Sequence, residues 1–378
     1  RDVAAETFVL LKNEGNLLPL KKQGKIALIG PLADTRNNIA GTWSVAQAPE
    51  KYTTIKEAME KALDGKATLL YAQGSNIWRD RELQKNGEQG KSIAWGDEVK
   101  MKNEALQIAK EADVIVCAMG ETADMSGECA SRTNLEMPDV QQELLAELAK
   151  TGKPVVLLNF AGRPTVLSWE NEHIPAIMNV WFGGSEVGDA LCDVIFGDKV
   201  PSGKLTTSMP KTTGQEPLYY NHQNTGRPVP DDNQKFAKFA SNCMDVSNGP
   251  LYPFGYGLSY TTFEYGDLKL SSHEVNMDDW KITATINVKN TGSRDADEIV
   301  QLYIRDMVAS ISRPVKELKG FQRIHLAAGE SREISFDITP EMLKFYNAEL
   351  KHVIEPGDFQ IMVGGNSKEV KTQNLTVK

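Results

Sequence analysis

Hydrophobic residues in the first half of the chain gather in short runs that alternate with amphipathic stretches. The runs predict strands at residues 25–30, 68–72, 113–120, 154–160 and 176–182. The stretches between them predict helices at residues 54–63, 102–112, 139–150 and 185–196. Near-continuous Val, Ile and Leu runs that alternate with helices are typical of a mostly parallel sheet covered on both faces. The first half is therefore predicted to be α/β, with a sheet of about five or six strands.

The beginning of the chain lacks the usual signals of a helix start. Residues 1–13 are predicted to be part of a helix whose start is missing. Apolar residues occur at Val3, Phe8, Leu10 and Leu11, and no capping residue precedes them. No signal peptide precedes this stretch. We therefore expect the chain to be the later part of a longer protein.

After about residue 259 the pattern changes to strands without intervening helices. Apolar and polar residues alternate with a period of two and predict strands at residues 263–270, 281–289, 298–305, 332–338 and 357–363. This pattern is typical of an immunoglobulin-like or fibronectin-type β-sandwich. The sequence before it has no clear period and is rich in Tyr, Asn, Pro and Gly. We predict an α/β domain at 1–212, a connecting segment at 213–258 and a β-sandwich domain at 259–378.

Composition and charge narrow the classes of partner. The 378 residues, 40% of them hydrophobic and 25% charged, are enough for two domains. The formal net charge is −9 and the basic residues are scattered among acids, which disfavours nucleic acid and anionic membranes as partners. The longest apolar runs are far shorter than a membrane span. The 4 cysteines have no CxxC pairing and no histidine at zinc-ligand spacing, so free thiols and no metal site are predicted.

The loop after the predicted strand at 113–120 is the most unusual polar segment. It holds Glu121, Asp124, Glu128 and Arg132. Ligands of doubly covered α/β sheets bind outside the carboxyl ends of the strands. A carboxylic acid presented there can donate a proton to a leaving group. Charge patterning alone favours the simpler interpretation, a surface loop with solvated charges.

Other motifs carry less information about function. The segment 183–188 follows a strand and opens a helix, but its acidic first turn repels phosphate. No other loop offers a phosphate-binding site, so a flavodoxin-like nucleotide binder is disfavoured. Trp43 favours a sugar-binding face if it is exposed and a core position if it is buried. The aromatic and polar residues at 219–228 fit sugar binding and loop packing equally well. No substrate-binding residue is assigned from these motifs.

A series of short motifs runs in order along the chain. They are LLKN at 10–13 with LLPL at 17–20, the loop at 120–133, NFAGRP at 159–164, FGG at 182–184, PSGKL at 201–205, YNH at 220–222 with GRP at 226–228, and LYPFGYGLSY at 251–260. Together they closely resemble glycoside hydrolase family 3 β-glucosidases of the bacterial periplasmic type, over essentially the whole chain. The resemblance implies an α/β sandwich domain followed by a fibronectin type III-like domain.

The resemblance also implies how the catalytic groups are divided. In that family an N-terminal (β/α)8 barrel carries a nucleophilic aspartate in a Ser-Asp-Trp/Tyr motif, which this sequence does not contain. The acid/base glutamate lies in a segment resembling Glu-Ala-Ser-Ser-Arg. Residues 128–132 read ECASR, so Glu128 is the implied general acid/base, and Cys129 replaces the usual small residue. Glu121, Ser131 and Arg132 are implied as supporting residues, with Arg132 paired to a neighbouring acid.

The implied activity is that of a retaining, exo-acting β-glucosidase that removes terminal non-reducing β-D-glucosyl residues. It needs no cofactor, and its implied partners are a β-glucoside or oligosaccharide and the barrel of the same polypeptide. The implied location is periplasmic or secreted, and a homodimer is left open. Two alternatives remain besides a nucleotide binder: a non-catalytic carbohydrate-binding or scaffold fragment, and a family 3 β-xylosidase.

Overall fold

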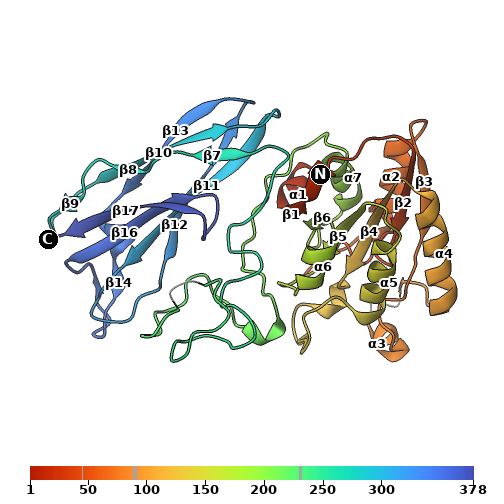
Figure 1. Ribbon diagram of the computed structural model, residues 1–378, viewed down its shortest axis with the longest axis horizontal. Coiled ribbons are helices and arrows are strands. Elements are labelled where there is room, and N and C mark those ends of the chain that lie inside the picture. Colours follow the sequence, from red (N-terminus) through yellow and green to blue (C-terminus); the bar gives the residue numbers. More distant parts are fainter. Residues whose placement is uncertain (45, 88–91, 230–231) are drawn as a thin grey trace. The chain divides into compact units, whose positions relative to one another are not determined.

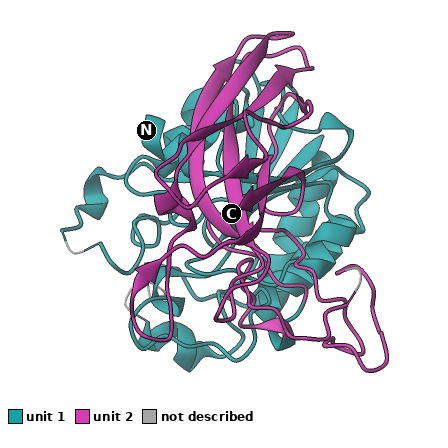
Figure 2. Ribbon diagram, turned by 90° about the vertical axis from the view of Figure 1, so that its left-hand side faces the viewer, with its two compact units in different colours: residues 1–203, 212–214 teal, residues 204–211, 215–378 magenta. Residues whose placement is uncertain are grey.

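The chain forms two compact units. The computed structural model describes residues 1–44, 46–87, 92–229 and 232–378. The first unit comprises residues 1–203 and 212–214, and the second comprises residues 204–211 and 215–378 (Figure 1 and Figure 2). These compact groups do not test the domain boundaries at residues 212 and 258, which stay a prediction.

The first unit is built on a six-stranded sheet with the order β1-β6-β5-β4-β2-β3. Five strands are parallel: β2 (Lys25–Ile29), β3 (Thr68–Ala72), β4 (Val114–Gly120), β5 (Val155–Phe160) and β6 (Ala176–Asn179). Every residue of β5 and of β6 is buried, as a sheet covered on both faces requires. The predicted α/β class of this half is confirmed.

The prediction for the first residues was partly wrong. Helix α1 (Asp2–Thr7) is short, and Val9–Asn13 forms strand β1, which pairs antiparallel with β6. The residues from Phe8 to Leu11 are all buried, so no face of this stretch is left for solvent. A short apolar run of this kind cannot be assigned by periodicity alone. Pairing with the edge of the sheet decides that it is a strand.

Helices cover both faces of this sheet (Figure 1). They are α2 (Ile55–Leu63), α3 (Arg81–Asn86), α4 (Glu98–Glu111), α5 (Asp139–Ala149), α6 (Ser168–His173) and α7 (Val187–Ile195). Helices α1 and α2 both pack against α7, whereas α4 packs against α5. The strand order explains this division. The chain runs from β2 outward to β3 and then returns past β2 to β4, and right-handed crossovers in opposite directions lie on opposite faces.

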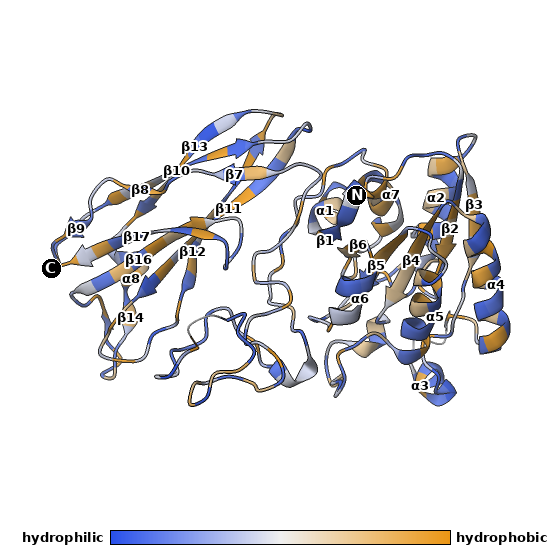
Figure 3. Cartoon of the chain, in the orientation of Figure 1, coloured by the Kyte–Doolittle hydropathy of each residue, from blue (hydrophilic) through white to orange (hydrophobic). Residues whose placement is uncertain are grey.

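The second unit contains a β-sandwich. One sheet holds β7 (Phe263–Tyr265), β8 (Lys269–Leu270), β10 (Ile282–Asn290) and β13 (Ser331–Ile338), and the other holds β9 (Glu274–Val275), β11 (Ala296–Asp306), β12 (Glu317–Leu326), β16 (Gly357–Gly364) and β17 (Val370–Val377). Along β10 every second residue is buried, and the alternation of polar and apolar positions is visible in Figure 3. The inward residues of both sheets form one apolar core. The predicted β-sandwich is confirmed, although the pattern did not predict β9, β12 and β17.

Shorter elements complete the structure. Strands β14 (Phe345–Tyr346) and β15 (His352–Val353) pair with each other and follow the short helix α8 (Pro340–Leu343). Single 3₁₀ turns occur at η1 (Glu14–Asn16), η2 (Pro49–Lys51), η4 (Ala123–Met125) and η5 (Thr213–Gln215). Among the described residues, no helix combines the length and the apolar character needed to span a bilayer.

The four cysteines are free thiols in the structure. Cys117 and Cys192 are buried, and burial raises the pKa of the Cys192 thiol to about 12. Cys129 is exposed and lies next to Glu128. In the described ranges, no three His, Cys, Asp or Glu side chains gather where they could hold a metal ion.

Helix α6 buries one carboxyl group, which predicts a pH-dependent stability. Glu170 is 2% exposed, and burial raises its pKa from 4.5 to about 7. The folded chain therefore keeps a proton that the unfolded chain has lost, and the free energy of unfolding falls as pH rises from 4.5 to 7. The difference between these pKa values corresponds to about 3 kcal/mol.

We expect Glu170→Gln to stabilise the chain by up to about 3 kcal/mol at pH 8.5 and to change its stability little at pH 4. Urea unfolding at both pH values measures this, with Glu172→Gln on the exposed side of the same helix as the control. An equal effect of Glu170→Gln at both pH values would show that the burial of a charge is not its cause.

Candidate active site

The loop singled out by the sequence lies where the strand order of the first unit reverses. Strands β4 and β2 are neighbours, but the chain continues from β2 to one side and from β4 to the other. Such a reversal opens a crevice outside the carboxyl ends of the two strands, where ligands of α/β sheets bind. The loop at 121–136 follows β4 directly. The sequence placed it at the carboxyl end of a strand, and the topology places it at this crevice.

A glycine allows the chain to leave β4 at this point. Gly120 stands opposite Phe160 of β5 and has a φ angle of +128°. A Cβ atom at Gly120 would lie 2.1 Å from the carbonyl oxygen of Phe160. A larger residue would therefore clash with backbone, and the turn into the loop requires glycine.

Glu121 is a buried anion between two arginines. Its side chain is 1% exposed, and its Oε1 accepts a hydrogen bond from Nη1 of Arg132 at 2.8 Å. The Nε of Arg163 lies 3.2 Å from the same oxygen. The other oxygen, Oε2, accepts the backbone N–H of Gly162 at 3.2 Å. A buried charge with this many partners holds three chain segments together.

Arg132 connects the loop to its own far end and to a tryptophan. Besides Glu121, its guanidinium donates through Nη2 to the carbonyl of Glu136 at 2.8 Å. The guanidinium lies 5.4 Å from the centre of the Trp78 ring, within the range of a cation–π contact. Arg132 is thus paired with a neighbouring acid, as the resemblance implied. Its supporting role in a reaction stays a prediction.

The sequence did not identify Arg163 as a site residue, although it lies in the NFAGRP motif. Its Nη2 donates to the carbonyl of Ala130 at 2.6 Å and also to the carbonyl of Met125. In addition, the hydroxyl of Thr42 donates to the carbonyl of Ser126 at 2.9 Å. The loop is therefore held by side chains that bond its backbone. These bonds could not be predicted from the sequence, because their acceptors are main-chain carbonyls and not side chains of opposite charge.

Glu128 lies on the exposed part of this loop. It is flanked by Gly127, with a φ angle of +103°, and by Cys129, with a φ angle of +61°. In the described part of the chain, no hydrogen bond or ion pair engages the Glu128 carboxylate. Ser131 is also exposed. The structure therefore brings Glu121 and Arg132 together, while Glu128 and Ser131 face outward on the same loop.

Trp43 lies beside the Glu128 loop. Its side chain is 70% exposed, and a Cβ atom added to Gly127 would lie 3.5 Å from the Trp43 Nε1. A core position is therefore wrong for this tryptophan. An exposed indole with a polar N–H is the alternative that favours a sugar face.

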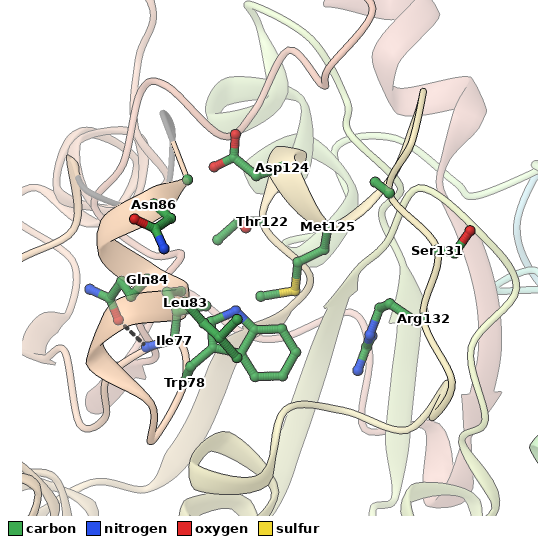
Figure 4. Close-up of a pocket in the computed structure, with 12 residues that line it drawn as sticks. Ile77, Trp78, Leu83, Gln84, Asn86, Thr122, Asp124, Met125, Ser131 and Arg132 are labelled. Atoms are coloured by element: carbon green, nitrogen blue, oxygen red, sulfur yellow. Dashed lines mark hydrogen bonds between the residues drawn. The ribbon is translucent and has the colours of Figure 1, made fainter.

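A cavity of about 440 Å³ lies along the loop (Figure 4). One wall comes from residues 77–87 and the other from residues 122–132. A neighbouring cavity of about 970 Å³ shares Trp78, Leu83, Ser131 and Arg132 with the first. Ser131 and Arg132 therefore line open space, whereas Glu128 does not line either cavity.

Comparison with known sequences defines the class of protein. Residues 8–260 match the sequence model of the glycosyl hydrolase family 3 C-terminal domain, and residues 298–367 match that of the fibronectin type III-like domain. These are the two parts that the sequence resemblance implied, in the same order. The chain belongs to glycosyl hydrolase family 3.

Two relatives that align with nearly the whole chain are named for different sugars, one for a glucoside and one for a xyloside. The chain is 46% identical to a periplasmic beta-glucosidase of Salmonella typhimurium over 374 residues, which are 98% of this chain and 48% of the relative. It is 37% identical to a beta-xylosidase of Formosa agariphila over 386 aligned positions, covering 100% of this chain and 50% of the relative. The chain thus spans about half the length of these relatives.

A solved structure confirms the fold. A beta-glucosidase from Listeria innocua, crystallised in complex with isofagomine, superposes with a TM-score of 0.87 and 35% sequence identity. The match covers 99% of this chain and 49% of that chain.

Proposed function

We propose that this chain is the C-terminal part of a retaining, exo-acting β-glucosidase, and that Glu128 is its general acid/base. One observation carries the proposal. The acid that the family motif selects lies on a loop at the crevice of the sheet, with its carboxylate free of protein partners in the described residues and the loop backbone held by Arg163. The match to glycosyl hydrolase family 3 supports the reaction class.

In the proposed reaction Glu128 acts twice. It first protonates the oxygen of the departing group while an aspartate attacks the anomeric carbon, and it then removes a proton from the water that releases the sugar. The aspartate belongs to the N-terminal barrel that the family resemblance implies. In retaining enzymes the two carboxyl groups stand about 5 to 5.5 Å apart. This division also explains why relatives are about twice as long as the chain.

A β-xylosidase is the second candidate, because a relative that aligns with the whole chain bears that name. A β-xyloside lacks the hydroxymethyl group of a β-glucoside. We therefore propose comparing kcat/KM of the intact enzyme for 4-nitrophenyl β-glucoside and 4-nitrophenyl β-xyloside. Preference for the glucoside supports our proposal, and preference for the xyloside contradicts its substrate. The name of the Salmonella typhimurium relative supports a periplasmic or secreted location.

We expect the isolated chain to show no appreciable hydrolysis of 4-nitrophenyl β-glucoside. A general acid contributes about 10²- to 10⁴-fold to a rate and still requires a nucleophile at the anomeric carbon. Activity assays with the purified chain, beside the longer protein as positive control, measure this. Turnover by the chain alone would contradict the proposed division. The non-catalytic alternative predicts instead that the longer protein is inactive while calorimetry detects glucose binding, for which the exposed Trp43 offers a surface.

A further inference from the structure

Arg163 joins the two ends of the segment that carries Glu128. It follows strand β5, and its guanidinium reaches the neighbouring loop after β4. One nitrogen, Nη2, donates to the carbonyls of both Met125 and Ala130. The residues between these two carbonyls, 126–129, include Glu128. A single side chain therefore closes the base of this segment.

Arg163 is itself fixed by the buried carboxylate of Glu121. The Nε of Arg163 lies 3.2 Å from Oε1 of Glu121, and the side chain of Arg163 is only 20% exposed. The adjacent Gly162 donates its backbone N–H to the second oxygen of Glu121 at 3.2 Å. The Arg163 guanidinium can lie beside the acid as its counter-ion while Nη2 donates to the two carbonyls, because its charge and its donors are spread over one rigid plane. A lysine ammonium is a compact charge and cannot reproduce this geometry.

The segment held by Arg163 has a backbone that needs support. Gly127 and Cys129, on either side of Glu128, both have positive φ angles, +103° and +61°. A non-glycine residue in this region costs of order 1–3 kcal/mol and persists only where its surroundings hold it. With the base of the segment released, Glu128 would be free to turn with the backbone. A misplacement of about 1 Å can lower a catalytic rate by about 10²-fold.

We propose that Arg163 is a positioning residue, which holds the backbone on both sides of Glu128 so that its carboxyl group meets the oxygen of the leaving group. This inference rests on the proposed role of Glu128. It assigns to the NFAGRP motif a function in proton transfer, exerted through main-chain carbonyls and not through contact with the sugar.

The test is Arg163→Lys in the intact enzyme, with kcat/KM measured on two substrates. We expect about a 10²-fold loss on methyl β-glucoside, whose leaving group needs a proton, and less than about a 5-fold loss on 2,4-dinitrophenyl β-glucoside, whose leaving group does not. The limb of the pH profile that reports the general acid should shift in the same variant. Arg323→Lys is the control for the exchange itself, because Arg323 is likewise an arginine paired with a carboxylate, that of Asp297, but lies in the β-sandwich unit.

Equal losses on both substrates, or none on either, would overturn the positioning role. Glu128→Gln is measured in parallel. If that variant lacks the dependence on the leaving group, the proposed function fails; if it shows the dependence and Arg163→Lys does not, only the present inference fails. Should Arg163→Lys not fold, Thr42→Val removes the hydroxyl that donates to the Ser126 carbonyl while keeping the side-chain shape. The same selective loss, but smaller, is then expected, and a loss shared by both substrates contradicts the inference.

Discussion

Replacing Glu128 by alanine in the intact enzyme is expected to slow hydrolysis of unactivated β-glucosides by about 10²- to 10⁴-fold, the usual contribution of a general acid. Substrates with good leaving groups should be affected far less in the step that forms the glycosyl-enzyme, since such groups depart without a proton. Kinetic constants for a series of aryl β-glucosides with different leaving-group pKa values measure this. The expected result is a much steeper dependence on the leaving group than in the parent enzyme.

Azide provides a second readout for the same variant. A small anion can attack the glycosyl-enzyme without a general base, so azide should restore turnover and yield a β-glycosyl azide. Glu136→Ala, which removes an exposed acid from the same loop, is the control and should show neither effect. If Glu128→Ala slows all substrates equally and azide does nothing, while Glu121→Ala shows the rescue, the acid/base role belongs to Glu121.

Replacing Glu121 by alanine is expected to reduce the stability of the first unit by about 3 to 5 kcal/mol. That is the usual cost of removing one partner from a buried ion pair, because the remaining charge stays buried without compensation. Here two guanidinium groups, those of Arg132 and Arg163, lose the carboxylate that they share. Urea unfolding of the chain, followed by circular dichroism, measures the change.

Glu128→Ala is the matched control for stability, since it removes an exposed acid from the same loop. Its effect should stay within about 0.5 kcal/mol. A loss below about 1 kcal/mol for Glu121→Ala would show that the arginines find other partners, and that Glu121 does not organise the loop. The two variants together distinguish Glu121, which is expected to stabilise the loop, from Glu128, which the loop exposes to solvent.

The sequence predicted the fold class because hydrophobic periodicity reports how many faces of an element are buried. Runs such as β5 and β6, buried along their whole length, belong in a covered parallel sheet, and the alternation in β10 belongs in a sandwich. The same reasoning failed at β1, where a buried edge strand and a buried helix give the same run of apolar residues. It also missed β12, where residues 317–323 are only partly buried or exposed and the alternation is weak.

Hydrophobic periodicity could not predict the order of the strands in the sheet. The order β3-β2-β4-β5-β6 is also that of flavodoxin-like sheets, so the architecture by itself did not separate a nucleotide binder from a glycosidase domain. The loop chemistry and the family match favour the glycosidase. The order does explain why the loop after β4 lies at the crevice, together with the loop after β2.

The sequence by itself determined the two-part architecture, and its resemblance to the family singled out the loop after β4 and Glu128 as the residue to test. Only the tertiary structure decided that Glu121 is a buried anion shared by Arg132 and Arg163, and that Arg163 bonds the carbonyls of Met125 and Ala130. The reason is physical. Periodicity and motifs report which side chains follow one another along a single stretch of chain. A hydrogen bond to a main-chain carbonyl depends instead on where two distant stretches meet. Any residue can supply the carbonyl, so the bond leaves no signal in the sequence of the acceptor.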